Sequence, residues 1–205
     1  FTMPREDIIR AARWAHENRY GSLVLQAGER QDQEFVSYVE GLLQEIKESS
    51  QGELGITLSL GEQSESTYRR WFEAGAHRYL LRIETSNTAL YQSLHPQDHD
   101  PAIRHACIAT LRSVGYQVGT GVMIGLPGQS SADLAQDINY CKTHAIDMIG
   151  MGPYIVHQQT PMGAAVDDFN PERQVELSLR MIALTRIMLK DVNIAATTAL
   201  QALHP

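Results

Sequence analysis

The chain has 205 residues, of which 43% are hydrophobic and 20% are charged, the proportions of an ordinary soluble globular protein. Its formal net charge of −7 argues against a nucleic-acid-binding protein, because such proteins usually carry a basic stripe. No apolar run approaches the roughly 18 residues of a membrane span, and no signal-peptide pattern opens the chain. We therefore expect a cytoplasmic protein that has neither a nucleic acid nor a membrane as partner.

The first 114 residues alternate between helical and strand-like patterns. The helices carry apolar residues on one face, and the strands are short apolar runs such as GITLSL. In chain order the pattern predicts a helix over 4–19, a strand over 22–26, a helix over 32–49, a strand over 55–60, a helix near 64–74, a strand over 78–83 and two helices near 87–94 and 101–114.

The same alternation continues through the second half of the chain. The pattern predicts a strand that runs into a glycine loop over 116–128, a helix near 130–144, a strand over 147–152, a long irregular stretch, a helix near 171–188 and a strand over 193–199. Short apolar strands that alternate with helices indicate a parallel sheet covered by helices.

About six strand–helix units are visible, whereas a closed (β/α)₈ barrel of the TIM type requires eight. The chain opens in a helix and stops just beyond a strand. We therefore predict an α/β fold that is a partial TIM-type barrel, with residues 1–205 as the central part of a single domain whose N- and C-terminal parts are absent. A complete doubly wound open sheet of six strands is the alternative.

The two cysteines, Cys107 and Cys141, both fall in segments that read as helices. Free thiols in the core are expected, because free cysteine is often buried and disulfides are uncommon in a reducing compartment. Two cysteines so far apart do not make a complete zinc or iron–sulfur motif, and no HxH, HExxH or clustered-carboxylate pattern indicates a mononuclear metal.

Ligands of parallel α/β proteins bind at the carboxyl ends of the strands, so the strand-end residues are the candidates for a site. The first strand stops at a glycine that a carboxylate follows, in the run VLQAGE. The candidates in chain order are Gln26, Gly28, Glu29, Thr57, Ser59, Arg82, Glu84, Gly121, Gly125, Gly128, Pro153, Tyr154, His157, Thr197 and Thr198.

Arg82 and Glu84 alternate in the run LLRIE, so both are expected on one face of their strand. They could form a buried ion pair that only ties the barrel together, or a clamp in which Arg binds a carboxylate and Glu an ammonium. Thr57 and Ser59 alternate likewise and could line the same interior or only hydrogen-bond to neighbouring strands.

The run GTGVMIGLPGQ places four glycines at the end of a strand, where backbone can approach a flat ligand or an anion closely. It is not a P-loop, because no Lys follows. His157 could be a ligand or an acid–base group, although a lone histidine in a loop is more often neither.

Six runs, in register from about Met3 to Leu200, resemble the radical S-adenosylmethionine (SAM) enzymes of the biotin-synthase type. Within that family the likeness is strongest to HydE-type maturases of iron-only hydrogenase. The runs are VLQAGE, TLSLGE, AGAHRYLLRIETSN, GTGVMIGLPGQ, IGMGPYIVHQQTPM and ALTRIMLKDVNIAATTAL.

The resemblance implies a role for each strand-end cluster. It assigns Glu29 and the backbone at Gln26 and Gly28 to the methionyl amino group of SAM, and Glu84 with Arg104 to its amino and carboxylate groups. Residues assigned to SAM are Gln26, Gly28, Glu29, Arg82, Glu84, Arg104, Met123, Gly125 and Leu126, the last three beside the adenine. Residues assigned to an amino-acid-like substrate are Thr57, Ser59, Arg78, Thr197 and Thr198.

Members of this family bind a [4Fe–4S] cluster through a CxxxCxxC loop ahead of the matching segment, and the 205 residues contain no such motif. Together with the strand count, this predicts a core fragment that holds no cluster ligand and cannot cleave SAM by itself. The full-length protein would reductively cleave SAM and act on a small substrate in assembly of the hydrogenase site.

The alternatives are a methylornithine synthase-like or biotin synthase-like enzyme, or a barrel that only binds a metabolite. A Schiff-base aldolase is disfavoured, since Lys47, Lys142 and Lys190 lie in or at the ends of helices. Expected partners are the small-molecule substrate, hydrogenase maturation proteins and, through exposed strand edges, a second copy of the fragment.

Overall fold

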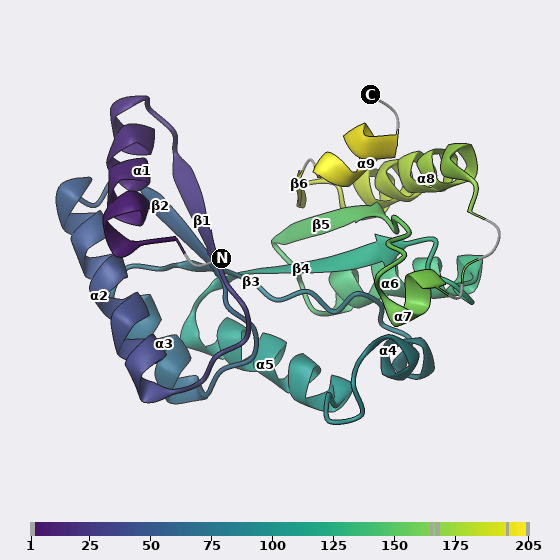
Figure 1. Cartoon of the computed structure of the whole chain (residues 1–205), viewed down its shortest axis with the longest axis horizontal. Helices are drawn as coiled ribbons and strands as arrows, with labels where there is room; N and C mark the ends of the chain where they lie inside the picture. Colours follow the sequence, from purple (N-terminus) through teal and green to yellow (C-terminus); the bar gives the residue numbers. More distant parts are fainter. Residues whose placement is uncertain (1–2, 165, 167–168, 196, 204–205) are drawn as a thin grey trace. The chain divides into compact units, whose positions relative to one another are not determined.

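The computed structural model describes residues 3–164, 166, 169–195 and 197–203. The chain divides into two units, Phe1–Leu81 with Ala106–Val118 and Arg82–His105 with Gly119–Pro205, and each is described by itself (Figure 1). Among the helices that the structure describes, none combines the length and apolarity that a bilayer crossing requires.

Unit 1 holds three parallel strands that follow the chain order. Val24 of the first strand lies opposite Thr57 of the second, and Thr57 lies opposite Arg78 of the third. The elements are α1 (Arg5–Glu17), β1 (Ser22–Gln26), α2 (Gln33–Ser49), β2 (Gly55–Ser59), α3 (Glu65–Glu73) and β3 (Arg78–Leu80). Leu43 and Ile46 of α2 are fully buried, as is Leu58 of β2, so the core of this unit lies on the helix-covered face.

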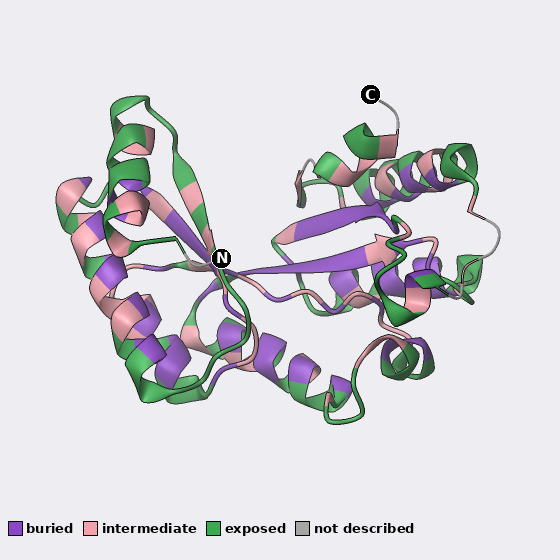
Figure 2. Cartoon of the chain, viewed as in Figure 1, coloured by how far each residue is buried: buried purple, intermediate pink, exposed green. Residues whose placement is uncertain are grey.

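Unit 2 holds strands β4 to β6, again parallel and in chain order, with Gly121 opposite Gly150 and Ile149 opposite Ile194. Strands β4 and β5 are buried along most of their length (Figure 2). The elements are α4 (Thr88–Leu94), α6 (Ser131–Thr143), β5 (Met148–Pro153), α7 (Pro161–Ala164), α8 (Pro171–Leu189), β6 (Asn193–Ala195) and α9 (Thr198–Leu203), and the chain passes between the units within α5 (Pro101–Val114) and β4 (Gln117–Ile124).

Side chains that accept from backbone N–H groups fix where the main helices begin. Asp32 caps α2 by accepting from the N–H of Phe35 at 3.0 Å, and Ser130 with Asp133 forms a reciprocal capping box on α6. Each such cap satisfies donors that a helix start otherwise leaves unpaired. The predicted starts of these helices therefore agree with the structure to within one or two residues.

Two predicted strands are shorter in the structure. The strand predicted over 78–83 ends at Leu80, and Glu84 forms only an isolated bridge with Val122. The strand predicted over 193–199 ends at Ala195, Ala196 lies outside the described residues, and Thr198 begins helix α9. The stretch predicted as irregular after β5 contains the short helix α7. The remaining predicted elements are confirmed.

The order of the strands distinguishes the two predicted architectures. Hydrogen-bonded neighbours follow the chain order from β1 to β3 and from β4 to β6, with helices between successive strands. A doubly wound sheet reverses its strand order at a switch point, whereas a (β/α) barrel does not. The arrangement is that of a partial barrel, as predicted.

Candidate functional site

In unit 1 the carboxyl ends of β1 and β2 lie side by side. Gln26 pairs with Ser59, and the N–H of Ala27 donates to the carbonyl of Ser59 at 3.3 Å. Gly28 follows on the exposed side, where no atom of the described residues lies within 4 Å of the place that a Cβ would take. A side chain at Gly28 would therefore meet open space, and the binding role predicted for this backbone stays a prediction.

Glu29 rests directly on the backbone of Gly61, which follows β2. A Cβ at Gly61 would stand 2.2 Å from Cγ of Glu29, and Gly61 has φ +74°, so glycine is required here twice over. The hydroxyl of the buried Tyr79 donates to the Gly61 carbonyl at 2.8 Å and holds this turn from below. Tyr79 in turn packs edge-on against Tyr68 and Tyr116.

The other predicted residues of unit 1 lie on the neighbouring strands β2 and β3. Thr57 is buried in the middle of β2, and Ser59, two residues further on the same face, is half-buried at its end. Arg78 begins β3, and its Nε donates to Oε1 of Gln117, the first residue of β4, at 2.9 Å. Arg78 is therefore level with Thr57 in the parallel register, and Ser59 lies two residues closer to the carboxyl ends of the strands.

In unit 2, Arg82 and Glu84 form a bidentate ion pair. Nε of Arg82 donates to Oε1 of Glu84 at 2.9 Å and an Nη donates to Oε2 at 3.2 Å. The side chains are 36% and 18% exposed, so the pair is only partly withdrawn from water. The sequence predicted both residues on one strand face; the structure keeps them together but places both beyond the end of β3.

Glu84 occupies a strained backbone conformation. Its φ is +59°, and the N–H of Thr85 donates across it to the carbonyl of Ile83 at 2.7 Å, which closes a three-residue turn. Such a conformation costs a residue with a Cβ on the order of 1–3 kcal/mol and persists only when its surroundings impose it.

Strand β4 supplies part of that restraint. The carbonyl of Gly121 accepts from the N–H groups of both Ile83 and Glu84, at 3.1 and 2.9 Å, and the N–H of Met123 donates to the Glu84 carbonyl at 2.9 Å. A Cβ at Gly121 would stand 2.9 Å from the carbonyl oxygen of Gly150 and 3.0 Å from Arg82. The absence of a side chain at Gly121 thus leaves room for Arg82 and the turn to pack against β4.

Arg104, from the start of α5, reaches the same segment. It is 7% exposed, and one Nη donates to the carbonyl of Arg82 at 3.1 Å. The structure therefore brings together three residues that the sequence associated with one ligand, namely Arg82, Glu84 and Arg104.

Two glutamines hold the glycine loop after β4. Oε1 of Gln129 accepts from the N–H groups of Gly125 and Leu126 at 2.7 and 3.2 Å, and its Nε2 donates to the carbonyl of Met123 at 3.0 Å. Gln174 of α8 donates to the carbonyl of Gly125 at 2.9 Å and fills the place of a Cβ there. Neither glutamine was singled out in the sequence, although Gln129 closes the GLPGQ run.

The two threonines near the C-terminus differ in their surroundings. The hydroxyl of Thr197 donates to the carbonyl of Met151 at 3.0 Å and lies 2.8 Å from the place that a Cβ on Gly152 would take. Thr198 is exposed at the start of α9. His157 is also exposed, in the loop after β5.

Two aspartates of α6, which the sequence did not single out, contact the segment that follows Glu84. Oδ1 of the fully buried Asp137 accepts from the N–H and the hydroxyl of Ser86, at 2.6 and 2.7 Å. Four residues earlier, Oδ1 of Asp133 accepts from Nδ2 of Asn87 at 2.7 Å. The spacing of four residues places both carboxylates on one face of the helix.

Their environments shift the two carboxyl groups in opposite directions. Burial raises the pKa of Asp137 to about 6, with Asp133 adding to the rise and the hydrogen bonds from Ser86 and Thr85 opposing it. Hydrogen bonds from Asn87 and Ser130 lower the pKa of Asp133. Hydrogen-bond donors thus stabilise the charged form of Asp133, whereas burial destabilises the charged form of Asp137.

The cysteines are buried free thiols, as predicted. Burial raises the pKa of Cys141 to about 12, so the thiolate that an iron–sulfur ligand requires is disfavoured there. Among the residues that the structure describes, no group of three or more His, Cys, Asp or Glu side chains could hold a metal ion. These residues do not fit an iron–sulfur cluster.

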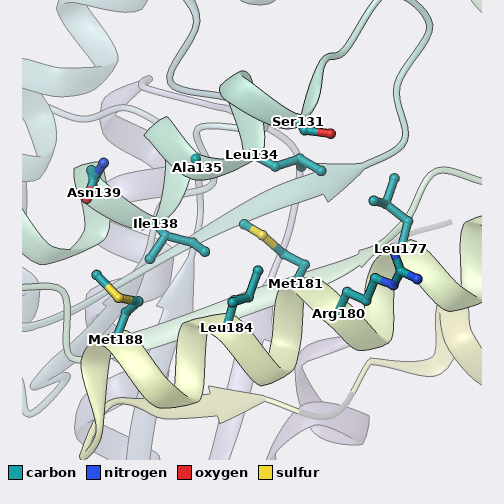
Figure 3. A pocket seen from close by; sticks show the side chains of 10 residues that line it. All are labelled: Ser131, Leu134, Ala135, Ile138, Asn139, Leu177, Arg180, Met181, Leu184 and Met188. Atoms are coloured by element: carbon teal, nitrogen blue, oxygen red, sulfur yellow. The ribbon is translucent and has the colours of Figure 1, made fainter.

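A separate apolar groove of about 400 Å³ lies between α6 and α8 (Figure 3). Leu134 and Ile138 line it from α6, and Met181, Leu184 and Met188 line it from α8. No predicted site residue contributes to it, so the groove is distinct from the strand-end clusters.

The parallel strands and their covering helices define a (β/α) barrel segment, and comparisons with known proteins identify its family. The model of the radical SAM superfamily matches residues 1–141. Over its whole length the chain is 42% identical to the [FeFe] hydrogenase maturase subunit HydE of Thermotoga maritima, and it covers 56% of that protein. The chain belongs to the radical SAM superfamily, whose members in general use SAM and a [4Fe–4S] cluster.

More distant relatives agree with this assignment. Biotin synthase of Staphylococcus aureus is 26% identical over 196 residues, which are 94% of the chain and 56% of that protein. The structure of methylornithine synthase (PylB) covers 97% of the chain with a TM-score of 0.79 at 21% identity, and 56% of that protein is matched. The structure of HydG from Carboxydothermus hydrogenoformans covers 99% of the chain with a TM-score of 0.78 at 18% identity. The match includes 49% of that protein.

These comparisons confirm the predicted fold and family. The two structural matches, at such low identity, support the barrel fold alone. The chain spans about half the length of the curated relatives that it matches.

The Asp137→Asn variant is expected to gain stability relative to the native chain as pH rises. The native carboxyl has a pKa of about 6, above the ordinary 3.8, so the folded state binds more protons than the unfolded state between these values. The stability of the native chain therefore falls as the pH rises from about 4 to 6. A pKa raised this far corresponds to about 3 kcal/mol of stability. Urea unfolding at a series of pH values measures it.

Asp133→Asn is the control with the opposite sign. The lowered pKa of Asp133 means that its ionised form contributes stability above the unfolded pKa, and this contribution is lost as pH falls. The variant is therefore expected to be less stable than the native chain at neutral pH and to approach it in acid. A pH-independent difference for Asp137→Asn would contradict the assignment.

Gly61→Ala is expected to lower the free energy of unfolding by about 1–2 kcal/mol, because it introduces a Cβ at positive φ against Glu29. Gly28→Ala is the matched control, since its Cβ meets open space, and it should change stability by less than about 0.5 kcal/mol. Chemical denaturation compares the two, and equal effects would show that the Glu29–Gly61 contact does not constrain the fold.

Proposed function

We propose that the chain is the core of a radical SAM maturase that acts in assembly of the iron-only hydrogenase active site. The observation that carries the proposal is the 42% identity with HydE along the whole chain, combined with Arg82, Glu84 and Arg104 at one strained turn. When bound, SAM and a reduced cluster together supply a 5′-deoxyadenosyl radical. The cluster ligands would belong to a CxxxCxxC segment outside these residues.

The residues of unit 2 fit SAM. Glu84 offers a partly exposed carboxylate for the ammonium of the methionyl group, and Arg82 and Arg104 offer guanidinium groups for its carboxylate. Withdrawal of these charges from water would strengthen the contacts, and the positive-φ turn holds the Glu84 backbone in one conformation before the ligand arrives.

The loop after β4 supplies a surface for the adenine. Met123 and Leu126 present apolar side chains beside backbone that Gln129 holds. Tyr154 packs in the same cluster, and its hydroxyl is buried without a hydrogen-bond partner among the described residues. A buried hydroxyl without a partner is costly, and a ring nitrogen of adenine would satisfy it.

We propose that Glu29 and the open backbone at Gln26 and Gly28 in unit 1 also contact SAM. The amino-acid-like substrate is assigned to Thr57, Ser59 and Arg78 of unit 1 and to Thr197 and Thr198 of unit 2. Hydroxyl and guanidinium groups suit the carboxylate of such a substrate. Thr197 already donates its hydroxyl proton to the carbonyl of Met151, so its oxygen would accept from the ammonium group of such a substrate and not bind the carboxylate.

A cytoplasmic location is proposed from the two buried free thiols, which a reducing compartment preserves. Hydrogenase maturation proteins are the proposed macromolecular partners, because HydE and HydG carry that role in their names. A methylornithine synthase-like activity is the second candidate, because the sequence runs resemble that class as well; the TM-score of 0.79 with that enzyme supports only the shared barrel fold.

Two steps test the function. The first is to read the coding sequence upstream of Phe1 for a CxxxCxxC motif within about a hundred codons. If it is present, the longer protein is reconstituted anaerobically and supplied with SAM, and we expect methionine and 5′-deoxyadenosine. An open reading frame that begins at Phe1 would exclude radical chemistry by this chain and favour a metabolite-binding barrel.

Glu84→Gln is expected to weaken SAM binding at least about tenfold, because it removes the charge that would face the ammonium group. Glu176→Gln is the matched control: Glu176 also pairs with an arginine, Arg180, but on the exposed surface of α8. Calorimetric titration with SAM measures both. Unchanged affinity in Glu84→Gln would remove Glu84 from the site.

The isolated chain is expected to dimerise through β1. This strand stands at one end of the strand order, its Val24 is 57% exposed, and an apolar groove of about 450 Å³ flanks it. An exposed strand edge favours pairing with another copy.

Light scattering over a wide concentration range should therefore detect a dimer that Val24→Lys dissociates. Ile187→Lys, at an exposed apolar position on α8, should leave the dimer intact. A monodisperse monomer at all concentrations would contradict the proposal.

A further inference from the structure

The turn at Glu84 is restrained from two sides, and only one of them is a strand. On the β4 side, Gly121 and Met123 bind the backbone of residues 83–84. On the α6 side, Asp137 accepts both the N–H and the hydroxyl of Ser86, two residues after Glu84. The second contact is made by a side chain, so mutation can remove it without changing the strand.

Packing alone does not explain an aspartate in the position of Asp137, because its burial is destabilising. It is 0% exposed, its Oδ2 forms no hydrogen bond that meets ordinary geometry, and the nearby Asp133 disfavours its charge. Burial of a carboxylate with incomplete partners costs free energy that an apolar side chain would avoid. The carboxylate binds the segment after Glu84 instead, through two hydrogen bonds from Ser86 and a contact with the side chain of Thr85.

Helix capping does not account for these bonds. Helix α4 is capped by Asn87, whose Oδ1 accepts from the N–H of Leu90 at 3.1 Å, and Asp133 binds the amide of that same Asn87. Asp133 also completes the capping box of α6 with Ser130. The cap of α4 and the start of α6 are therefore served without Asp137.

We propose that Asp137 is a positioning residue for the SAM site: by holding Ser86, it keeps Glu84 in its left-handed conformation and the Glu84 carboxylate in place for the ligand. The inference rests on the proposed function, because it takes Glu84 as a SAM ligand. Asp137 itself makes no contact with SAM in this arrangement and acts only through the backbone of residues 84–86.

Three variants of α6 separate positioning from stability. Asp137→Ala removes the acceptor, whereas Asp137→Asn keeps an amide oxygen where Oδ1 stands and removes the charge. Ile138→Ala, which truncates the adjacent residue where it packs toward α8, is a control for general loosening of the helix. For each, amide hydrogen exchange is measured at Thr85 and Ser86 without ligand, and SAM affinity is measured by calorimetry.

Asp137→Ala is expected to lose protection at Ser86 by about tenfold or more and to bind SAM about tenfold more weakly. Asp137→Asn should restore both towards the native values. Ile138→Ala should be less stable with its SAM affinity unchanged.

Loss of SAM affinity in Asp137→Ala and Ile138→Ala alike would reduce the role to structural support and overturn the proposal. So would native exchange at Ser86 in Asp137→Ala. If the native chain and the reconstituted longer protein both fail to bind SAM, the proposed function fails; the exchange data then still decide whether Asp137 holds the turn.

Discussion

The positive-φ turn at Glu84 is the constraint on which the candidate site depends. A residue with a Cβ adopts this conformation only under restraint, and here the restraint comes from two N–H bonds to the carbonyl of Gly121, from Met123 and from Asp137 through Ser86. Hydrogen bonds from the surrounding strand and helix offset this strain, which is on the order of 1–3 kcal/mol. In return, the carboxylate is held at the strand end before any ligand binds.

The same principle recurs in unit 1 with different chemistry. Gly61 accepts the positive φ without a steric penalty, and the side chain of Glu29 lies in the space that its missing Cβ leaves. The buried hydroxyl of Tyr79 holds the turn from the core. In both units, therefore, a carboxylate after a strand is positioned by a turn that the core restrains, and neither depends on a long flexible loop.

The architecture could be predicted from the sequence because its cause is local. Apolar runs such as GITLSL and the capping residues Asp32 and Ser130 mark the strands and helix starts directly. The early end of β3 could not be predicted, since LLRIE alternates like a strand, and the contacts that hold the turn come from Gly121, Met123 and Asp137, far away in the sequence. Asp137 was missed because a charged residue on a helix ordinarily indicates a solvated face. Gly61 and Gln174 were missed because their partners lie far away in the sequence.

A crystal structure of the protein soaked with SAM under anaerobic conditions would show whether the restrained turn at Glu84 binds the methionyl group. We expect Glu84 and Arg104 within hydrogen-bond distance of the amino and carboxylate groups of the methionyl moiety, with Glu84 still at positive φ and Asp137 still bound to Ser86. SAM bound elsewhere, or a Glu84 that relaxes to negative φ when SAM binds, would contradict this expectation.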